Sequence, residues 1–506
     1  MNTEQFFELS PRDDFNEQLL ANAHPADWEN PTPSGRYNLV VIGGGTAGLV
    51  SAAVAAGLGG KVALIERGLL GGDCLNVGCV PSKALIRAGK AAAHAREAVD
   101  FGVEVGKVEV DFASVMSRVR EIRAGISPHD SAKRFRDLGV DVFLGAAEFQ
   151  NDSTVSVDGV GLQFRKAVIA TGGRAVLPPI EGLEKAAPLT NHTLFNLTVL
   201  PKRLAVIGGG PIGCEMAQAF QRLGSEVTLV QRGEAILPSE DPDAAGWVRA
   251  RLEREGVRVL TGSEVSKVTL DGKDKTLTVK SPDGSEEITV DEILVSAGRR
   301  PNTEGLALQK AGVEANERGV VIDDFFRTSN RRIFAAGDVA MEKKFTHAAD
   351  FAARAVVQNA LFFGRKRLSA LSIPWCTYTE PEVAHVGLGP LEAARNGVEI
   401  DSYTREFADV DRGKTDSETE GFVRIHTRKG TDQIVGATIV GSQAGELISE
   451  VGVAMGGKMG LGALASVIHP YPTQAEAIRQ LGDAYNKKRF TPTVAKFFRW
   501  WLSKSR

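Results

Sequence analysis

The chain has 506 residues, a formal net charge of −3 and 43% hydrophobic residues, which predicts a globular protein of about three domains. Because the charge is near neutral, no nucleic-acid partner is expected. No apolar run reaches the roughly 18 residues of a spanning helix, and four cysteines in so long a chain favour a reducing compartment, the cytoplasm.

Residues 1–36 are polar and contain prolines, as in the stretch HPADWENPTPSG. We expect an extension without a core of its own. Its polar start, MNTEQFFELSPRDD, does not have the pattern of a signal peptide.

The next stretch predicts a strand, a glycine turn, an alanine-rich helix and a second strand, in the sequence YNLVVIGGGTAGLVSAAVAAGLGGKVALIER. Gly43, Gly45 and Gly48 fill the template G-x-G-x-x-G, in which glycines allow a tight turn and close approach of the backbone to a pyrophosphate. The N–H groups at the helix N-terminus would bind the phosphates. Glu66 ends the second strand, where a carboxylate accepts hydrogen bonds from a ribose 2′-hydroxyl. The unit predicts a dinucleotide site.

Two of the four cysteines, Cys74 and Cys79, lie five residues apart in GGDCLNVGCVPSK. A structural zinc or an iron–sulfur cluster needs about four ligands, and neither Cys214 nor Cys376 obviously completes such a set. On an ideal helix these positions would be about 8.6 Å apart, whereas a disulfide tolerates roughly 7 Å. A disulfide would therefore require an irregular backbone around Asn76 and Gly78.

The dinucleotide unit then recurs in RLAVIGGGPIGCEMAQAFQRLGSEVTLVQR, with Gly208, Gly210 and Gly213 at the template positions. Two fingerprints predict two bound dinucleotides. At the position that Glu66 holds in the first copy, the second has Gln231, followed by Arg232. An arginine there suits a 2′-phosphate, so we expect NADPH, with NADH as the second option. The alternative is that Arg232 is only a solvated residue at a strand end.

The cysteine segment resembles the redox-active disulfide of the pyridine nucleotide–disulfide oxidoreductases, the flavoprotein family of glutathione reductase, dihydrolipoamide dehydrogenase and mercuric reductase. The motifs ATGG at 170–173, SAGRRPN at 296–302 and FAAGD at 334–338 are similar to the family's later nucleotide-domain motifs, and the resemblance covers about residues 37–490. It implies an α/β fold with two Rossmann-like domains, for FAD and NAD(P), and a C-terminal α+β dimerisation domain. The expected division is 1–36 extension, 37–175 and 304–370 FAD domain, 176–303 NAD(P) domain, 371–490 interface domain and 491–506 basic aromatic tail.

The resemblance also implies roles for individual residues. Cys74 and Cys79 would form the redox disulfide, with Cys79 nearest the flavin and Cys74 attacking the substrate. Lys83 and Glu215 match an ion pair beside the flavin ring; the alternative for Lys83 is a surface lysine on the helix. Asp338 would bind the ribityl chain of FAD, and the motif glycines would contact the cofactors: Gly172 and Gly298.

The C-terminal third contains IPWCTYTEPEVAHVGLG at 373–389 and HPYPTQAEA at 469–477, which resemble landmarks of the interface domain. The resemblance implies a homodimer whose active sites are shared between subunits. The family places a catalytic histidine directly before Pro-Thr and a glutamate further on. Here Glu476 is present, but Tyr471 holds the histidine position and His469 stands two residues earlier.

Tyrosine is a poor general base, because deprotonating it at pH 7 costs about 4 kcal/mol. A tyrosine at this place is similar to mercuric reductase. The chain nevertheless lacks both the C-terminal pair of vicinal cysteines and the N-terminal CxxC domain of mercuric reductases. Hg(II) would thus have to reach Cys74 and Cys79 directly, as a transient substrate ion.

The leading interpretation is a mercuric-reductase-like flavoprotein that reduces a soft metal ion or a small oxidant. The nearest alternative is a dihydrolipoamide dehydrogenase that uses His469 as its base. An alternative of another class is a membrane-associated electron-transfer subunit, with a weak membrane-surface contact through 491–506. A non-catalytic flavin-binding protein fits least, because both thiols, Lys83 and Glu215 are in place.

Overall fold

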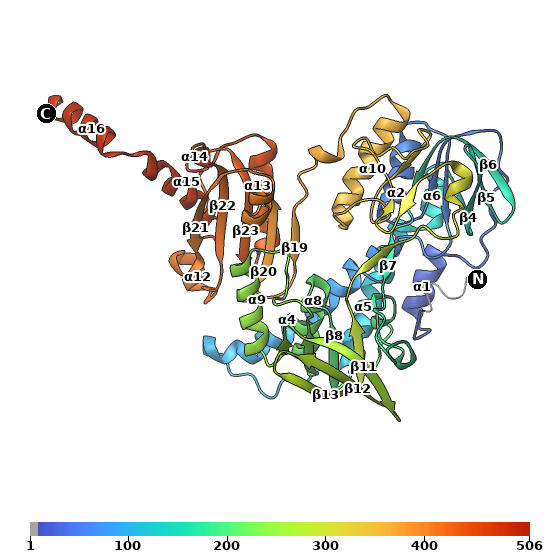
Figure 1. The fold of residues 1–506 in the computed structure, drawn as a ribbon, viewed down its shortest axis with the longest axis horizontal. Coiled ribbons are helices and arrows are strands. Elements are labelled where there is room, and N and C mark those ends of the chain that lie inside the picture. Colours follow the sequence, from blue (N-terminus) through green and yellow to red (C-terminus); the bar gives the residue numbers. More distant parts are fainter. Residues whose placement is uncertain (1–8, 506) are drawn as a thin grey trace. The chain divides into compact units, whose positions relative to one another are not determined.

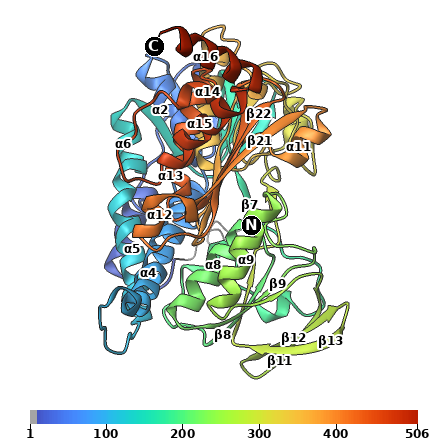
Figure 2. The same ribbon diagram turned by 90° about the vertical axis from the view of Figure 1, so that its left-hand side faces the viewer.

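The computed structural model describes residues 9–505, which divide into two compact units. Within the described residues, the first unit contains 9–209, 216–232 and 260–371, and the second contains 210–215, 233–259 and 372–505. Figures 1 and 2 show the elements coloured along the chain. No helix among the described residues has both the length and the apolar character that crossing a bilayer requires.

A seven-stranded sheet forms the centre of the first unit, in the order β3-β2-β1-β6-β5-β4 with β18 also paired to β6. The pairs β1–β2, β2–β3, β1–β6 and β18–β6 are parallel, whereas β4, β5 and β6 form an antiparallel meander. Strands β1 and β2 are apolar along nearly their whole length because both faces of a parallel sheet are covered. The strands are β1 (Tyr37–Ile42), β2 (Val62–Glu66), β3 (Val140–Leu144), β4 (Ala147–Asn151), β5 (Thr154–Val157), β6 (Val160–Ile169) and β18 (Ile333–Ala335).

Helices α2 and α10 pack against each other in this unit, as Figure 1 shows. The short strands β7 (Gly173–Ala175) and β15 (Arg299–Pro301) pair and so join the motifs ATGG and SAGRRPN; β16 (Ala315–Asn316) pairs with β17 (Gly319–Val320). The helices are α1 (Asp14–Ala23), α2 (Thr46–Gly57), α3 (Gly72–Asn76), α4 (Cys79–Glu97), α5 (Phe112–Ile126), α6 (Ala132–Asp137), α7 (Asn191–Leu194) and α10 (Thr346–Leu361).

The N-terminal extension contributes helix α1, which the sequence analysis did not predict. Asp13 caps the helix by accepting the N–H of Asn16. The buried guanidinium of Arg123, in α5, donates to Asn16 Oδ1 at 2.7 Å. Since α1 also packs on α5, the extension is anchored on the first unit by polar contacts as well as by buried Leu19.

The second dinucleotide segment forms a four-stranded sheet in the order β10-β9-β8-β14, with β8 parallel to both β9 and β14. An antiparallel sheet, β11-β12-β13, follows. The elements are β8 (Arg203–Ile207), α8 (Pro211–Leu223), β9 (Glu226–Val230), α9 (Pro242–Arg254), β10 (Arg258–Leu260), β11 (Glu264–Asp271), β12 (Asp274–Ser281), β13 (Gly284–Val290) and β14 (Glu292–Val295).

The second unit is built on a five-stranded antiparallel sheet in the order β19-β20-β23-β22-β21. Figure 2 shows α13 and α15 along this sheet, and their apolar faces share one buried core with it. Its elements are β19 (Trp375–Thr377), β20 (Glu382–Gly387), α11 (Pro390–Arg395), β21 (Ile400–Glu406), α12 (Asp411–Thr415), β22 (Phe422–Arg428), β23 (Ile434–Gly441), α13 (Ala444–Gly456), α14 (Leu461–Leu464), α15 (Glu476–Arg489) and α16 (Pro492–Lys504). The expected α/β class with a C-terminal α+β domain is confirmed.

Candidate active site

The first fingerprint forms a cradle at the end of β1. Gly43 has a φ of +107°, and a Cβ there would collide with the carbonyl oxygen of Ala170. A Cβ on Gly48 would collide with the carbonyl of Gly43. Helix α2 begins after Gly45 without a side-chain cap, so no capping side chain competes with a ligand for its first N–H groups. These features fit a dinucleotide pyrophosphate.

Glu66, at the end of β2, is tied to the same loop. Its carboxylate accepts the N–H of Gly44 at 2.5 Å and the N–H of Gly68 at 2.6 Å. Burial raises the pKa of Glu66, and these two hydrogen bonds oppose the shift. An ionised carboxylate has about four acceptor positions, so two hydrogen bonds leave capacity for the predicted ribose hydroxyl.

The redox segment lies directly against this cradle. The N–H of Gly71 donates to the carbonyl of Gly44 at 2.9 Å. A Cβ on Gly72 would lie 2.6 Å from the Cα of Gly45, and Gly72 has a φ of +55°. Sequence reasoning missed Gly72; its signal is the glycine pair that precedes Cys74.

The two cysteines lie on either side of a helix break. Cys74 is in α3, which ends at Asn76, and Cys79 begins α4. A Cβ on Gly78 would lie 2.7 Å from the carbonyl oxygen of Asp73, so the break requires a glycine. The irregular backbone that the spacing argument required around Asn76 and Gly78 is therefore present.

The two thiols interact and differ in environment; both are reduced in the structure. A hydrogen bond with Cys79, reinforced by burial, raises the pKa of Cys74 far above its usual range. Cys79 stands at the N-terminus of α4, where the helix dipole stabilises a thiolate. Its Sγ is 3.3 Å from Oγ1 of Thr346. The environment of Cys74 therefore disfavours its thiolate, whereas the helix N-terminus at Cys79 favours one.

A chain of charged side chains connects this segment to FAAGD. Arg299 pairs with Asp73, and its Nε lies 3.4 Å from Asp338 Oδ2. Burial raises the pKa of Asp338, and the positive charge of Arg299 opposes that shift. Arg299 Nε is buried without a hydrogen-bond partner in the described part of the chain. Sequence reasoning missed Asp73 and Arg299, although Arg299 lies within SAGRRPN.

The motif glycines lie where the paired strands β7 and β15 begin. Gly172 has a φ of +68° and Gly298 a φ of +140°. Arg299 donates to the carbonyl of Gly173 at 2.9 Å. The motifs ATGG and SAGRRPN, more than a hundred residues apart, therefore meet beside Asp338.

The second fingerprint repeats the first in detail. Gly208 has a φ of +111°, and a Cβ on it would lie 2.9 Å from the carbonyl of Ser296. Gly210 precedes α8, and Gly213 lies in its first turn. Gln231 Oε1 accepts the N–H of Gly209 at 2.9 Å.

Arg232 follows Gln231 and is exposed. Within the described residues, its side chain makes no hydrogen bond or ion pair. Its guanidinium can therefore take a ligand phosphate without losing a protein contact.

Lys83 and Glu215 lie in α4 and α8. Glu215 is buried, and its Oε1 accepts the N–H of Tyr378 at 2.9 Å. Lys83 follows the cysteine pair, and Glu215 follows the second fingerprint. The ion pair between these two side chains stays a prediction.

His469 is held by both ring nitrogens. Nδ1 lies 3.0 Å from the carbonyl oxygen of Val467, and Nε2 lies 2.8 Å from Glu450 Oε1. Both partners are acceptors, so both contacts are hydrogen bonds only when the ring carries two protons. Both ring nitrogens of His469 are therefore already in contact with protein oxygen atoms.

Tyr471 and Glu476 lie near the start of α15. Tyr471 is 71% exposed, and its hydroxyl donates to Asp411 Oδ2 at 3.1 Å. This hydrogen bond raises the pKa of Tyr471, so less of the phenolate that could act as a base is present at neutral pH. Glu476 is buried and lies 3.1 Å from Arg479.

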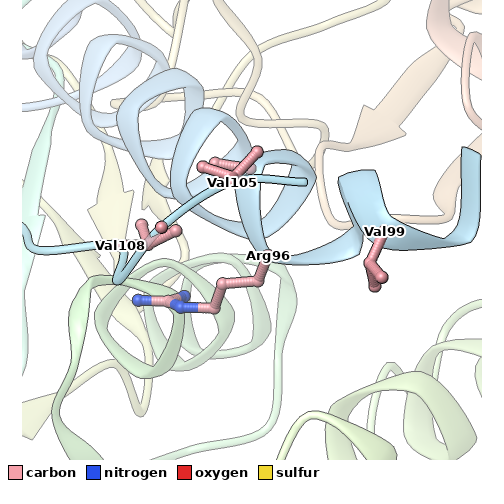
Figure 3. Close-up of a pocket in the computed structure, with 6 residues that line it drawn as sticks. Arg96, Val99, Val105 and Val108 are labelled. Atoms are coloured by element: carbon pink, nitrogen blue, oxygen red, sulfur yellow. The ribbon is translucent and has the colours of Figure 1, made fainter. Parts of the chain in front are cut away.

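A pocket of about 250 Å³ lies elsewhere, at the other end of α4. Arg96, Val99, Val105 and Val108 line it, as Figure 3 shows. Arg96 donates to the carbonyl of Arg222 at 2.6 Å. Since α4 rises 1.5 Å per residue, the pocket is roughly 25 Å from Cys79 and is not part of the redox site. No cluster of three or more metal-ligating side chains occurs in residues 9–505.

Comparisons with known proteins show the family of the chain. Residues 37–358 match the pyridine nucleotide-disulphide oxidoreductase family, and residues 373–481 match its dimerisation domain. The chain is 35% identical to a mercuric reductase of Lysinibacillus sphaericus, over 89% of this chain and 83% of that protein. It is also 35% identical to a dihydrolipoyl dehydrogenase of Thermus scotoductus, over 89% of this chain and 98% of that protein.

Among solved structures, the Cu(II) complex of the HOCl-induced flavoprotein disulfide reductase RclA from Escherichia coli is similar. It aligns with a TM-score of 0.78 and 27% identity, over 87% of this chain and 98% of that one.

Proposed function

The chain belongs to the pyridine nucleotide-disulphide oxidoreductase family, and from this premise we propose that it is an NADPH-dependent flavoprotein that reduces a soft metal ion, such as Hg(II), or a small oxidant. The family binds FAD and a pyridine nucleotide. Identity does not separate the two kinds of relative, because the chain is equally similar to a mercuric reductase and to a dihydrolipoyl dehydrogenase. The choice between these substrates is therefore inferred from the side chains of the site.

The observation that carries this choice of substrate is the absence of an available base directly before the Pro-Thr pair. Reaction with a dithiol or disulfide requires a group that takes and returns a proton. Tyr471 is a phenol whose pKa is raised by its hydrogen bond to Asp411, and His469 uses both nitrogens in contacts to Val467 and Glu450. A soft metal ion needs only thiolate ligands. The site therefore suits a metal ion better than a disulfide.

The residues that would hold the cofactors follow from the two cradles. Gly43, Gly45 and Gly48 would bind the FAD pyrophosphate, Glu66 its ribose and Asp338 its ribityl chain. Gly208, Gly210 and Gly213 would bind NADPH, with Arg232 on the 2′-phosphate. When bound, FAD supplies hydride and electron transfer between NADPH and the thiol pair.

The two thiols have separate tasks. Cys79, stabilised as a thiolate at the helix N-terminus, would face the flavin. Cys74 keeps its proton until a substrate arrives, then loses it and binds the ion. The pair would provide two sulfur ligands to Hg(II), with the single proton of the Cys74 thiol released to solvent. Lys83 and Glu215 would set the charge beside the flavin ring.

One of the similar structures widens the set of acceptors. The RclA structure is a Cu(II) complex of an HOCl-induced reductase, which supports a metal ion or an oxidant as the substrate class here. The dimerisation domain supports a homodimer. We assign to this homodimer active sites that are shared between its subunits, and a cytoplasmic location. The sparse use of cysteine supports that compartment.

An anaerobic acceptor screen tests the proposal. The purified protein is reduced with NADPH, and reoxidation is followed after adding Hg(II), Cu(II), lipoamide or glutathione disulfide. We expect the metal ions to reoxidise it at least tenfold faster than the disulfides. Cys74→Ser serves as the control, since it should lose metal turnover while retaining reduction by NADPH. A faster reaction with lipoamide would instead establish a dihydrolipoamide dehydrogenase.

A further inference from the structure

Helix α16, close to the C-terminal end, exposes an unusual amount of aromatic surface. None of its side chains is buried. About half of each large apolar side chain is exposed: Phe497 55%, Phe498 46%, Trp500 54%, Trp501 59% and Leu502 57%. The rings contact each other, with centroids of Phe497 and Phe498 5.8 Å apart. A contiguous apolar patch of this kind marks an interaction site.

The helix is well formed and amphipathic. Thr491 caps it by accepting the N–H of Val494, and Pro492 occupies its first turn. At 100° per residue, one arc of about 140° contains only apolar side chains. These are Val494, Phe497, Phe498, Trp501 and Leu502. Lys496, Arg499 and Ser503 lie on the opposite face.

The charge around this helix has one sign. Residues 484–506 contain seven basic residues and no aspartate or glutamate. They are Lys487, Lys488, Arg489, Lys496, Arg499, Lys504 and Arg506. Within the described part of the chain, Lys488 lies 3.8 Å from Asp401, and Lys504 lies over the ring of Trp500 at 5.9 Å. Neither contact neutralises the segment.

We propose that α16 docks the protein reversibly on an anionic lipid surface. The aromatic face would enter the boundary between headgroups and acyl chains, and the lysines and arginines would contact the lipid phosphates. Thirteen residues are too few to span a bilayer, so the helix lies in the plane of the surface. Pairing with the same helix of a second copy would bring like charges together, which the charge pattern disfavours. This inference does not depend on the substrate of the reductase.

Vesicle flotation with the full-length holoenzyme tests the proposal. Vesicles of phosphatidylcholine alone are compared with vesicles containing about 30% phosphatidylglycerol. We expect at least tenfold stronger binding to the anionic vesicles, and loss of that binding at high salt because the Debye length shortens. Equal binding to both compositions, or binding to neither, overturns the proposal.

Two variants separate the apolar and charged contributions. Phe497→Ser/Trp501→Ser removes the apolar face, and Lys496→Glu/Arg499→Glu reverses the charge. Each should lower binding to anionic vesicles at least tenfold while NADPH-dependent turnover and Tm stay unchanged. The matched control, Phe363→Ser/Lys366→Glu, removes a 92% exposed phenylalanine elsewhere and should bind like the unmodified protein. If the α16 variants instead convert dimers to monomers in sedimentation, the helix is a subunit contact and the proposal is wrong.

Discussion

Glu66 and Gln231 accept the same hydrogen bond in the two copies of the fingerprint. Glu66 Oε2 accepts the N–H of Gly44, and Gln231 Oε1 accepts the N–H of Gly209. Each acceptor stands 22 residues after its donor. The glutamine therefore keeps the contact within the loop while removing the negative charge that would repel a 2′-phosphate.

We expect Arg232→Ala to lower kcat/KM for NADPH by roughly 10- to 100-fold, since a charge-assisted contact to a phosphate is worth about 1.5–3 kcal/mol. The value for NADH should stay nearly unchanged and serves as the internal control. Relative to the unmodified protein, Gln231→Glu should shift the preference from NADPH toward NADH, because it places a carboxylate beside the 2′-phosphate. Steady-state kinetics with both nucleotides measure this. Equal losses for both nucleotides in Arg232→Ala would indicate a structural role for the arginine.

The division of roles between the thiols has a spectroscopic test. FAD should copurify with the protein, and two-electron reduction should produce a long-wavelength charge-transfer band from the Cys79 thiolate. Cys79→Ser should abolish the band, whereas Cys74→Ser should keep it and lose turnover. Cys376→Ser is the matched control and should keep both. A Cys79→Ser protein with the band intact would contradict the assignment.

Tyr471→His should raise weak disulfide activity by supplying a base with a pKa near 6.5, and should weaken turnover of Hg(II). Because His469 is bound to Glu450 and Val467, His469→Ala should leave disulfide activity almost unchanged. Both variants are assayed with lipoamide, glutathione disulfide and Hg(II). Loss of a robust lipoamide activity in His469→Ala alone would refute the mercuric-reductase-like interpretation.

Gly72→Ala should destabilise the redox segment. The new Cβ would lie 2.6 Å from the Cα of Gly45, and the backbone has a φ of +55°, which costs about 1–3 kcal/mol for a residue other than glycine. We expect a lower Tm and weaker FAD retention. Gly246→Ala is the control, because that glycine is in helix α9 with open space around it and alanine there should stabilise by up to about 1 kcal/mol. An unchanged Tm and full FAD content in Gly72→Ala would contradict this packing.

The second unit should lose stability in acid because of His426. Burial lowers the pKa of His426 to about 4, with the charge of His385 adding to the effect. Since the folded pKa lies below the unfolded value of about 6.5, the unfolded chain binds the extra proton. The contribution of neutral His426 to the free energy of unfolding is therefore present above pH 6.5. It is lost as the pH falls toward 4, and the loss is up to ~3 kcal/mol.

Urea unfolding at pH 7 and pH 4.5 checks this acid sensitivity. His426→Gln should flatten the pH dependence, and His129→Gln, at an exposed position, should leave it as in the unmodified protein. If the free energy of unfolding changes with pH by the same amount in the unmodified protein and in both variants, His426 is not the cause.

Local patterns in the amino-acid sequence predicted both fingerprints and singled out the cysteine pair, and the resemblance of these motifs to a known family implied the fold class. Gly43 and Gly208 are recognisable because a strand, a turn and a helix depend on neighbours within about thirty residues. The break between Cys74 and Cys79 followed from helix geometry together with the premise that the two cysteines form a disulfide.

Only the tertiary structure decided which side chains are already engaged. The contacts of His469 with Glu450, of Arg299 with Asp73 and of Gly72 with Gly45 join positions 19, 226 and 27 residues apart, and no local period encodes such distances. The same holds for the exposed face of α16, whose aromatic residues read along the chain could equally have been part of a core. Burial depends on what the rest of the chain covers, and that is settled only when distant segments pack together.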